Sequence, residues 1–460
     1  MKDLPAEIVT EIAKQSFPGY NTTLALSHTC RGIRKVLLES KSLWTEINSC
    51  CLKKIRTFLK RSGSLPLGVT FKVSERDDFG VIGELTCQAE RWKTLTLSAD
   101  FNADYFNSPL MDWPELSGKL IVPNLESIRL VLEANGDGFS EDRSGNGTKR
   151  ALTEQRFNLC ISNWQVDKLK TMFLVNFIPT ISGESPKSLT ELFIDLGGEQ
   201  SQEDFKLSRP LTVLKCLPSL RYLKFVLREN YSANSYFGYR TDLIHGNLKR
   251  LSIDLYLMSD GAKFIRSLKR FRFPALEDLE IVLRDPRNRN IHVGRGDYGE
   301  YSPSGVENLL QSLLKNVQAP GIKRLSISVG GSIISNETTG FKYYSIPFSL
   351  IPHLEEVNIH IDGLIPDFKE FIDVSSPISI LRLAGHPFDN GGDTIRAYAP
   401  IIREYEGELY PKEVAFVYCG PKNEGLGRSL FQKPTTTIWD PYGEITQLPM
   451  FWVSRPQLEP

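Results

Sequence analysis

A short apolar pattern recurs along most of the chain and limits the folds that it can adopt. The pattern is an apolar residue, two variable residues, a second apolar residue, one variable residue and a third apolar residue. Its ten occurrences are Trp92/Leu95/Leu97, Leu125/Ile128/Leu130, Leu169/Met172/Leu174, Leu189/Leu192/Ile194, Leu220/Leu223/Phe225, Leu248/Leu251/Ile253, Leu276/Leu279/Ile281, Ile322/Leu325/Ile327, Leu354/Val357/Ile359 and Ile378/Leu381/Leu383. Their first positions lie on average about 32 residues apart, a period typical of stacked repeats. Since no such unit buries its apolar face alone, neighbouring units must build one continuous core.

Five of these triplets have a proline at the same position, two residues before their first apolar residue. These prolines are Pro123, Pro218, Pro274, Pro320 and Pro352. Each unit is expected to form one short strand whose alternate side chains point towards the core. We therefore predict an α/β fold in which an irregular leucine-rich-repeat solenoid carries a parallel sheet on its concave side. Unrelated strands in an ordinary α/β domain are the alternative.

The first 47 residues have a helical pattern instead. Pro5 suits a first helical turn because its missing N–H has no intrahelical partner there, and Ile8 and Ile12 then share one helical face. A second helix is predicted from an apolar stripe at steps of four, three and four residues, formed by Leu26, Cys30, Ile33 and Leu37. A segment of under about 50 residues rarely builds a sufficient core alone. Either the rest of the chain or a partner must therefore cover this stripe.

Three parts of this segment together resemble an F-box, over about residues 3–47. They are Leu4-Pro5-x-Glu7-Ile8, Leu26-Ser27-x-x-Cys30-Arg31-x-Ile33 and Ser42-Leu43-Trp44. Many F-boxes carry an aromatic residue where Ile33 stands, which is a departure at the docking surface. The resemblance implies binding to the Skp adaptor of an SCF-type cullin–RING ubiquitin ligase, and through it to a cullin. The implied adaptor-binding residues are Leu4, Pro5, Ile8, Ile12, Leu26, Cys30, Ile33, Leu43 and Trp44.

These patterns divide the chain into four parts. An F-box-like module over residues 1–50 precedes a linking helix over 51–64, and the repeats occupy 65–430. A Pro-rich segment over 431–460 is expected to cap the last repeat, which otherwise exposes core. Helix-like returns between strands are predicted over Leu211–Leu217, Ala262–Phe271 and Val306–Val317. Four polar stretches are expected to be surface insertions: Glu133–Arg150, Arg228–Gly246, Arg284–Ser302 and Gly330–Ser345.

The composition predicts an intracellular protein. Lys and Arg together number 55, as do Asp and Glu, so no net field favours nucleic acid or membrane. No apolar run approaches the length of a membrane span, and the chain starts without the apolar region of a signal peptide. The seven cysteines are scattered and form no C-x-x-C pair, which indicates reduced thiols in the cytoplasm or nucleus.

No motif predicts an enzyme, a metal or a cofactor. The run Gly294-Arg295-Gly296-Asp297-Tyr298-Gly299 has the G-x-G-x-x-G spacing of a phosphate-binding loop. That chemistry needs the glycines between a strand and a helix, whereas Pro303 and Asn- and Arg-rich sequence surround this run. The six histidines have no metal-ligand spacing. We expect a non-catalytic protein without a cofactor.

The strand pattern also predicts where a target binds. Residues that alternate with the buried apolar ones point to the opposite face of the sheet, and aromatic residues and Arg are enriched at interface hot spots. The predicted target-binding residues are Phe173, Phe193, Tyr222, Lys224, Arg250, Arg324 and His360. Arg250 and Arg324 are expected to bind a carboxylate or phosphate of the target. The pairing of an F-box-like segment with irregular leucine-rich repeats resembles a family of ligase substrate receptors, which implies the substrate-recognition subunit of an SCF-type ligase. The alternative is a scaffold without ligase, in which the N-terminal helices only cap the solenoid.

Overall fold

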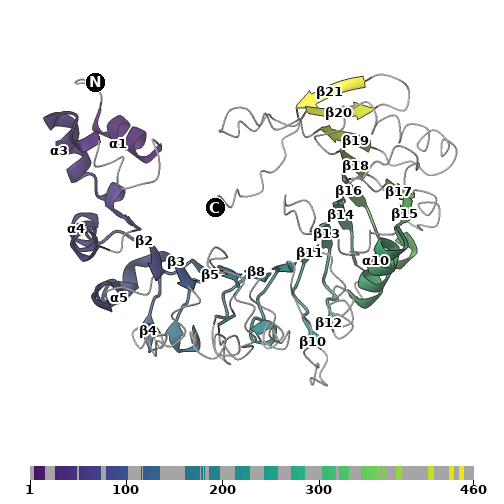
Figure 1. Ribbon diagram of the computed structural model, residues 1–460, viewed down its shortest axis with the longest axis horizontal. Helices are drawn as coiled ribbons and strands as arrows, with labels where there is room; N and C mark the ends of the chain where they lie inside the picture. The colour runs from purple at the N-terminus through teal and green to yellow at the C-terminus, as the bar shows by residue number, and fades with distance from the viewer. Residues whose placement is uncertain are drawn as a thin grey trace, which may run out of the picture. The chain divides into compact units, whose positions relative to one another are not determined.

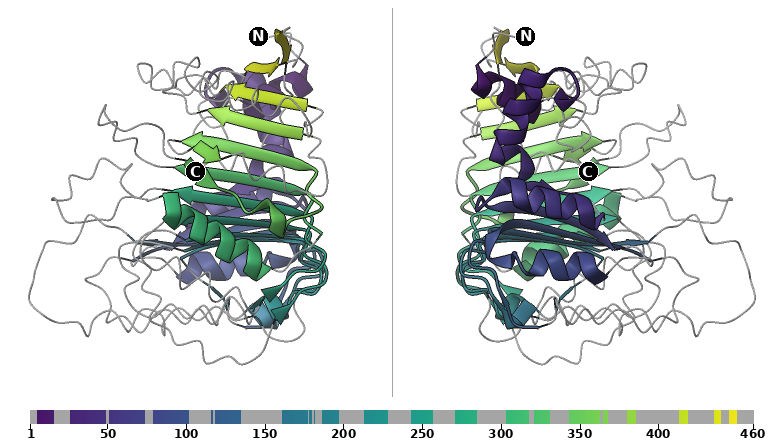
Figure 2. Two further views of the ribbon diagram at one scale, coloured as in Figure 1. Left: turned by 90° about the vertical axis from the view of Figure 1, so that its right-hand side faces the viewer. Right: turned by 90° about the vertical axis from the view of Figure 1, so that its left-hand side faces the viewer.

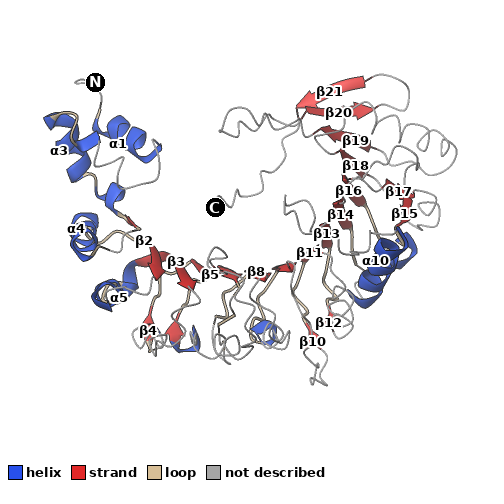
Figure 3. Ribbon diagram, viewed as in Figure 1, coloured by secondary structure: helices blue, strands red, loops and turns tan. Residues whose placement is uncertain are grey.

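The computed structural model divides into two compact units, Met1–Leu220 (unit 1) and Arg221–Pro460 (unit 2). Figure 1 and Figure 3 show the elements of both units. The structure describes residues 5–15, 26–48, 51–73, 79–101, 116, 118–134, 161–176, 178–179, 181, 186–196, 213–227, 243–256, 271–284, 303–317, 321–330, 343–362, 365–367, 380–385, 413–418, 435–439 and 445–449.

The main sheet of unit 1 consists of parallel strands, each of which pairs with the one that follows it in the sheet. In sheet order they are β1 (Glu46–Ile47), β2 (Leu67–Val73), β3 (Trp92–Phe101), β5 (Ser127–Ala134), β7 (Thr171–Val175) and β8 (Glu191–Leu196). The short strands β4 (Leu120–Ile121) and β6 (Trp164–Gln165) pair separately, also in parallel. Apolar side chains alternate along β2, where Leu67, Val69 and Phe71 are buried.

Unit 2 has the same arrangement and ends in an antiparallel segment. Its parallel strands are β9 (Tyr222–Leu227), β11 (Arg250–Tyr256), β13 (Asp278–Arg284), β14 (Arg324–Gly330), β16 (Glu356–Asp362), β18 (Ile380–Gly385) and β19 (Glu413–Tyr418). The strands β20 (Thr435–Trp439) and β21 (Ile445–Pro449) then pair antiparallel. Two further parallel pairs join β10 (Leu243–Ile244) to β12 (Phe271–Arg272) and β15 (Tyr343–Ser345) to β17 (Ile365–Asp367). Figure 2 shows the strands of unit 2 side by side.

The apolar triplets form the core of both units. Within unit 2, Leu223, Leu251 and Leu279 lie directly opposite one another on adjacent strands. Every side chain of the nine triplets from Trp92/Leu95/Leu97 to Leu354/Val357/Ile359 is at most 4% exposed. The side chains of the tenth triplet lie outside the described residues, although β18 covers Leu381 and Leu383. The predicted α/β class and parallel sheet are therefore confirmed.

Two backbone contacts recur at the start of the strands. A tight turn leads into the first apolar residue of a triplet, with its N–H bound to the carbonyl three residues earlier, as in Leu125 to Val122 and Leu276 to Phe273. The carbonyl of the residue before a strand then accepts two N–H groups from the next strand's start. The two amides of Lys170 and Thr171 thus share the carbonyl of Glu126. The repeated sequence therefore forms a repeated local structure in both units.

In the described ranges, few helices accompany the strands (Figure 3). They are α1 (Ala6–Gln15), α3 (Arg31–Glu39), α4 (Leu52–Ser62), α5 (Phe79–Thr86) and α10 (Pro303–Val317), with 3-10 turns η1 (Lys41–Trp44), η2 (Ala89–Arg91), η6 (Ile161–Asn163) and η8 (Phe348–Leu350). The predicted linking helix over 51–64 corresponds to α4, which ends before Gly63, where φ is +62°. The predicted return helix over Val306–Val317 lies within α10. Most of Ala262–Phe271, of the four predicted insertions and of the C-terminal segment lies outside the described residues.

The N-terminal helices pack as a small cluster. Val9 and Ala13 of α1 contact Ile33 and Leu37 of α3. The prediction of one helix running from Leu26 through Cys30 was wrong, because α3 begins only at Arg31. Cys30 has an extended backbone, with φ −154° and ψ 161°, and its Sγ accepts a hydrogen bond from the Ile33 N–H at 3.4 Å. A residue that caps a helix N-terminus in this way cannot belong to the helical stripe.

Trp44 joins this cluster to the sheet. Its side chain is 1% exposed, and its indole Nε1–H donates to the Leu37 carbonyl at 2.9 Å. The ring meets Phe58 of α4 edge-on at 5.2 Å between centroids, and the Arg61 guanidinium lies 4.3 Å from its centre. Directly after Trp44, β1 pairs with the edge of β2. The helical cluster and the first strands of unit 1 are therefore one packed structure.

Replacing Leu251 by Ala tests the repeated core. Leu251, the second residue of β11, is 1% exposed, so its loss leaves a cavity and should lower the free energy of unfolding by about 2–5 kcal/mol. Urea titration followed by circular dichroism measures the change. Ile244→Ala is the control, because Ile244 is 63% exposed and should cost less than about 0.5 kcal/mol. Equal effects of the two substitutions would contradict the assignment of the core.

Candidate interaction surfaces

We call the side of the strands that faces away from the apolar triplets the open face. It carries the residues that alternate with the buried ones, since successive side chains of a strand point to opposite sides. In unit 1 its residues include Thr94, Thr96, Ser98, Ser127, Arg129, Thr171, Phe173, Val175, Glu191, Phe193 and Asp195. In unit 2 they include Tyr222, Lys224, Arg250, Ser252, Asp254, Asp278, Glu280, Arg324, Ser326, Glu356 and Asn358.

An aromatic pair lies on the open face of unit 1. Phe173 on β7 and Phe193 on β8 are direct neighbours in the parallel register. Their rings are stacked, with centroids 4.3 Å apart and planes inclined by 13°. Both side chains are partly exposed. The structure thus brings together two of the predicted target-binding residues as one apolar platform.

Arg129 extends this platform and was missing from the sequence prediction. It lies on β5 in register with Phe173 and is partly exposed. The alternation that selected Phe173 also selects Arg129, because both occupy the position between the second and third residues of a triplet. The signal was therefore present in the sequence.

A second predicted pair lies on the open face of unit 2. Tyr222 of β9 and Arg250 of β11 are register neighbours, and the Arg250 guanidinium lies 4.9 Å from the centre of the Tyr222 ring. Such a cation–π contact is worth about 0.5–1 kcal/mol at an exposed site. Lys224 follows Tyr222 on the same face of β9 and is partly exposed. These residues combine an aromatic ring with positive charge.

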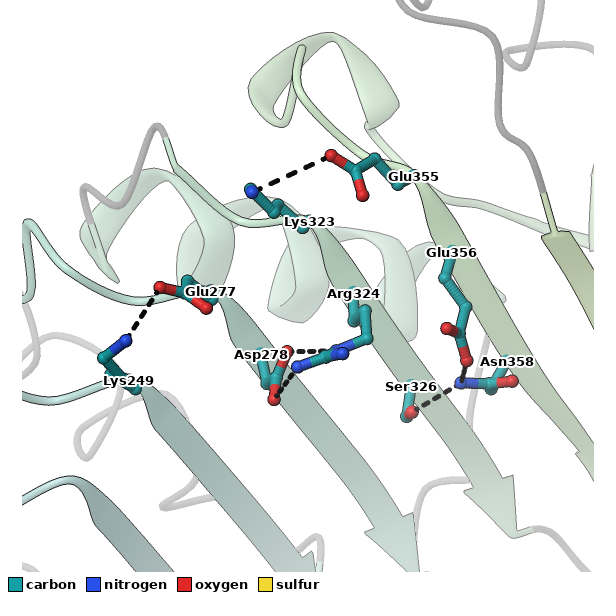
Figure 4. Close-up of polar contacts among 9 residues, drawn as sticks. All are labelled: Lys249, Glu277, Asp278, Lys323, Arg324, Ser326, Glu355, Glu356 and Asn358. Carbon is teal, nitrogen blue, oxygen red and sulfur yellow. Dashed lines mark hydrogen bonds and ion pairs between the residues drawn. The ribbon is translucent and has the colours of Figure 1, made fainter. Parts of the chain in front are cut away.

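Arg324 is held by the chain's own carboxylates. Its Nε and Nη2 donate to the two carboxylate oxygens of Asp278 on the neighbouring strand, with Nη2 at 2.7 Å from Oδ2 (Figure 4). The hydrogen bond from Arg324 to Asp278 raises the pKa of Arg324, with Glu356 contributing from the other side. The two-pronged contact that the sequence predicted for a target is thus made to Asp278.

Charges alternate from strand to strand along unit 2. Lys249 pairs with Glu277 at 3.3 Å and Lys323 with Glu355 at 3.9 Å, each residue directly preceding its strand (Figure 4). Lys93 and Glu126 form the same contact in unit 1 at 3.9 Å. On the open face Asn358 donates to Ser326 at 3.2 Å and to Glu356 at 3.1 Å. From β13 to β16 the polar side chains therefore largely satisfy one another.

Part of the open face of unit 2 is buried. Ser252 is fully buried and donates its hydroxyl to a Glu280 carboxylate oxygen at 2.7 Å, and Asp254 is 3% exposed. Among the open-face residues of β11 whose side chains the structure describes, Arg250 at the start of the strand is the exposed one. The side chain of the predicted residue His360 lies outside the described residues.

The predicted adaptor-binding residues fall into two groups. Ile8 and Ile12 of α1 are 47% and 41% exposed, and Pro5 and Cys30 are exposed as well. The others with described side chains lie in or against the helical core: Leu26, Ile33, Leu43 and Trp44. Leu4 lies outside the described residues. The structure thus presents an apolar strip on α1 and places Ile33 and Trp44 beneath the surface.

Comparisons with known proteins do not assign this chain to a family. No family model matches it, and no curated protein matches it. Within the ranges that the structure describes, no group of three or more His, Cys, Asp and Glu residues is arranged to hold a metal ion. In the same ranges, no helix has the length and apolar character needed to cross a membrane. The exposed strip of α1 and the open face are the two candidate interaction surfaces.

A double-mutant cycle on Asp278 and Arg324 tests the cross-strand pairing. Because the contact is bidentate but Arg324 is half exposed, we expect a coupling free energy of about 0.5–1 kcal/mol. The coupling should weaken in 1 M NaCl, since salt screens exposed charges. Urea titrations of Asp278→Ala, Arg324→Ala and the double variant give this value. Strictly additive effects at low salt would contradict the pairing.

Proposed function

We propose that this protein is the substrate-recognition subunit of an SCF-type ubiquitin ligase. In this proposal residues 1–50 form an F-box that docks on the Skp adaptor, residues 65–430 form a leucine-rich-repeat solenoid, and other subunits carry out the transfer of ubiquitin. The protein itself is not catalytic and acts in the cytoplasm or nucleus. The proposal combines the F-box-like motifs of the sequence with the exposed strip of α1 and the open face.

The exposed isoleucines of α1 are the observation that carries the docking proposal. Val9 and Ala13 bury one face of α1, whereas Ile8 and Ile12 lie one turn apart on an adjacent face and are exposed. Burying an isoleucine side chain contributes roughly 1.5–3 kcal/mol. Because Ile8 and Ile12 are 47% and 41% exposed, a partner that covers both would gain about half of this free energy per side chain, without rearranging the helical cluster. Both residues belong to the helix that the F-box-like motif Leu4-Pro5-x-Glu7-Ile8 opens.

The recurring strand geometry supports the solenoid proposal. In both units a tight turn, a carbonyl shared by two amides and a buried triplet recur in the same order. Stacked repeats of this kind present extended binding surfaces. On this basis we assign target binding to the open face of each unit. Phe173/Phe193 in unit 1 and Tyr222/Arg250 in unit 2 supply the residue types that are enriched at hot spots.

The alternative role, a scaffold without ligase, is favoured by the position of Trp44. This residue and β1 tie the helical cluster to the first strands, which is what a terminal cap requires. A cap explains the buried residues of the cluster. It does not explain why Ile8 and Ile12 remain exposed, so the two roles differ in what they predict for these residues.

Replacing both Ile8 and Ile12 by Ser tests the docking proposal. We expect the double variant to lose at least about tenfold in co-purification with the Skp adaptor, because the apolar contact is removed. Its melting temperature should stay close to that of the wild type, since both side chains are exposed. Quantitative pull-down from cells and thermal unfolding of the purified protein measure these two effects.

Ile121→Ser provides the matched control, since Ile121 is an isoleucine of unit 1 with a similar exposure of 45%. It should leave adaptor binding unchanged. Undiminished pull-down of the Ile8→Ser/Ile12→Ser variant would refute the F-box proposal and leave the scaffold role. Proximity labelling with and without residues 1–47 would then identify targets in either case.

A further inference from the structure

Two of the arginines on the open face have carboxylates as register neighbours. Arg324 lies between Asp278 and Glu356, and Arg250 lies between Tyr222 and Asp278. The positive charge of each is therefore partly compensated by the protein itself. An incoming anion at Arg324 would have to displace Asp278.

Arg129 has a different environment. Its register neighbours are Thr96 on β3 and Phe173 on β7. The diagonal positions on these strands, which are also within side-chain reach, are uncharged as well: Thr94, Ser98, Thr171 and Val175. Among the open-face arginines whose side chains the structure describes, Arg129 is thus the one without a carboxylate at any of these positions.

The aromatic pair beside Arg129 favours the same kind of ligand. Phe173 and Phe193 stack face to face, so each ring covers one face of the other, and both side chains are partly exposed, so that their ring edges can contact a ligand. Ring edges carry positive partial charge and apolar surface. On the far side of the pair, Glu191 and Asp195 flank Phe193 on β8. Anions are therefore favoured at the Arg129 end of the platform and disfavoured at the other end.

From this arrangement we infer that Arg129 binds an anionic side chain on an extended segment of the target protein. A large apolar side chain of the same segment covers Phe173 and Phe193. The inference rests on the proposed function only in placing the target on the open face. Strands are about 4.8 Å apart, so the midpoint of the phenylalanine pair lies about 7 Å across the sheet from Arg129. Side chains two residues apart on an extended segment are also about 7 Å apart. The recognised pattern is therefore anion-x-apolar.

Two residue types supply the anion. The Arg guanidinium binds carboxylate and phosphate oxygens with the same fork of N–H donors. A glutamate and a phosphoserine therefore share the chemistry, and the difference between them determines whether target binding depends on phosphorylation. The experiment separates the two.

The test uses purified full-length protein and fluorescein-labelled nine-residue peptides with Gly and Ser at the remaining positions. The central triplets are Glu-Ser-Phe, phosphoserine-Ser-Phe, Lys-Ser-Phe and Glu-Ser-Ser. We expect at least one of the two anionic, Phe-containing peptides to bind about tenfold more tightly than the Lys-Ser-Phe and Glu-Ser-Ser peptides, as measured by fluorescence anisotropy. Binding of Glu-Ser-Phe identifies a constitutive acidic segment, and binding of the phosphoserine peptide alone identifies a phosphorylated one.

Variants assign the effect to Arg129. Arg129→Gln should reduce anionic-peptide binding about tenfold, and Arg129→Lys should reduce it less, because the charge is kept but the planar fork is lost. Arg324→Gln is the matched control and should change binding by less than about twofold, since Asp278 already occupies that guanidinium. Thermal unfolding shows that each variant is folded.

Three results would overturn the inference. They are equal binding of the Lys-Ser-Phe peptide, undiminished binding by folded Arg129→Gln protein, and no binding of any peptide at millimolar concentration. The proposed function fails separately, through the adaptor pull-down. Loss of adaptor binding with retained peptide binding leaves the Arg129 site in a scaffold, and the opposite result leaves a ligase subunit that binds its target elsewhere.

Discussion

The fold depends on burying three apolar side chains per repeat in one shared parallel register. A slip of one residue would turn every inward side chain to the opposite face of the sheet, so the cost of an error rises with each strand added. Leu223, Leu251 and Leu279 lie directly opposite one another and are almost fully buried. At roughly 1.5–3 kcal/mol for each buried side chain, this row outweighs any single polar contact on the surface. The positions of the surface side chains depend on the strand register that this buried row fixes.

Surface charges also influence which strands become neighbours in the sheet. Lys249, Glu277 and Lys323 precede successive strands and alternate in sign. Exposed pairs of this kind contribute little stability individually, but like charges directly opposite one another would disfavour a strand order that brought them together. The same pairing removes these residues from the set available to a partner. Charge on the surface therefore does not by itself mark a binding site, and the register neighbours of each charged residue decide its role.

The sequence predicted the core better than the surface. The triplets were recognised because a buried position needs only the right residue type at the right spacing, and nine of them are buried as predicted. The helix boundary at Cys30 was missed because an N-cap depends on backbone conformation, which apolar periodicity does not reveal. Arg324 was selected by residue type, although its partner Asp278 lies 46 positions away. Arg129 was overlooked although its position follows the same alternation. Which strands become neighbours, and hence which side chains compensate one another, follows only from the fold.

The carbonyl shared by two amides at the start of a strand has a consequence for how such a chain changes during evolution. It fixes the beginning of each strand on its neighbour, whatever the length of the connection that leads there. The first apolar residues of successive triplets lie 20 residues apart at Leu169 and Leu189 but 46 apart at Leu276 and Ile322. Both connections nevertheless lead into strands that begin with the same shared-carbonyl contact. Doubling the length of a flexible connection costs only about 0.6 kcal/mol in closure entropy. Insertions and deletions in flexible parts of these connections therefore cost little, and the lineage can diversify there while the strand positions stay constant.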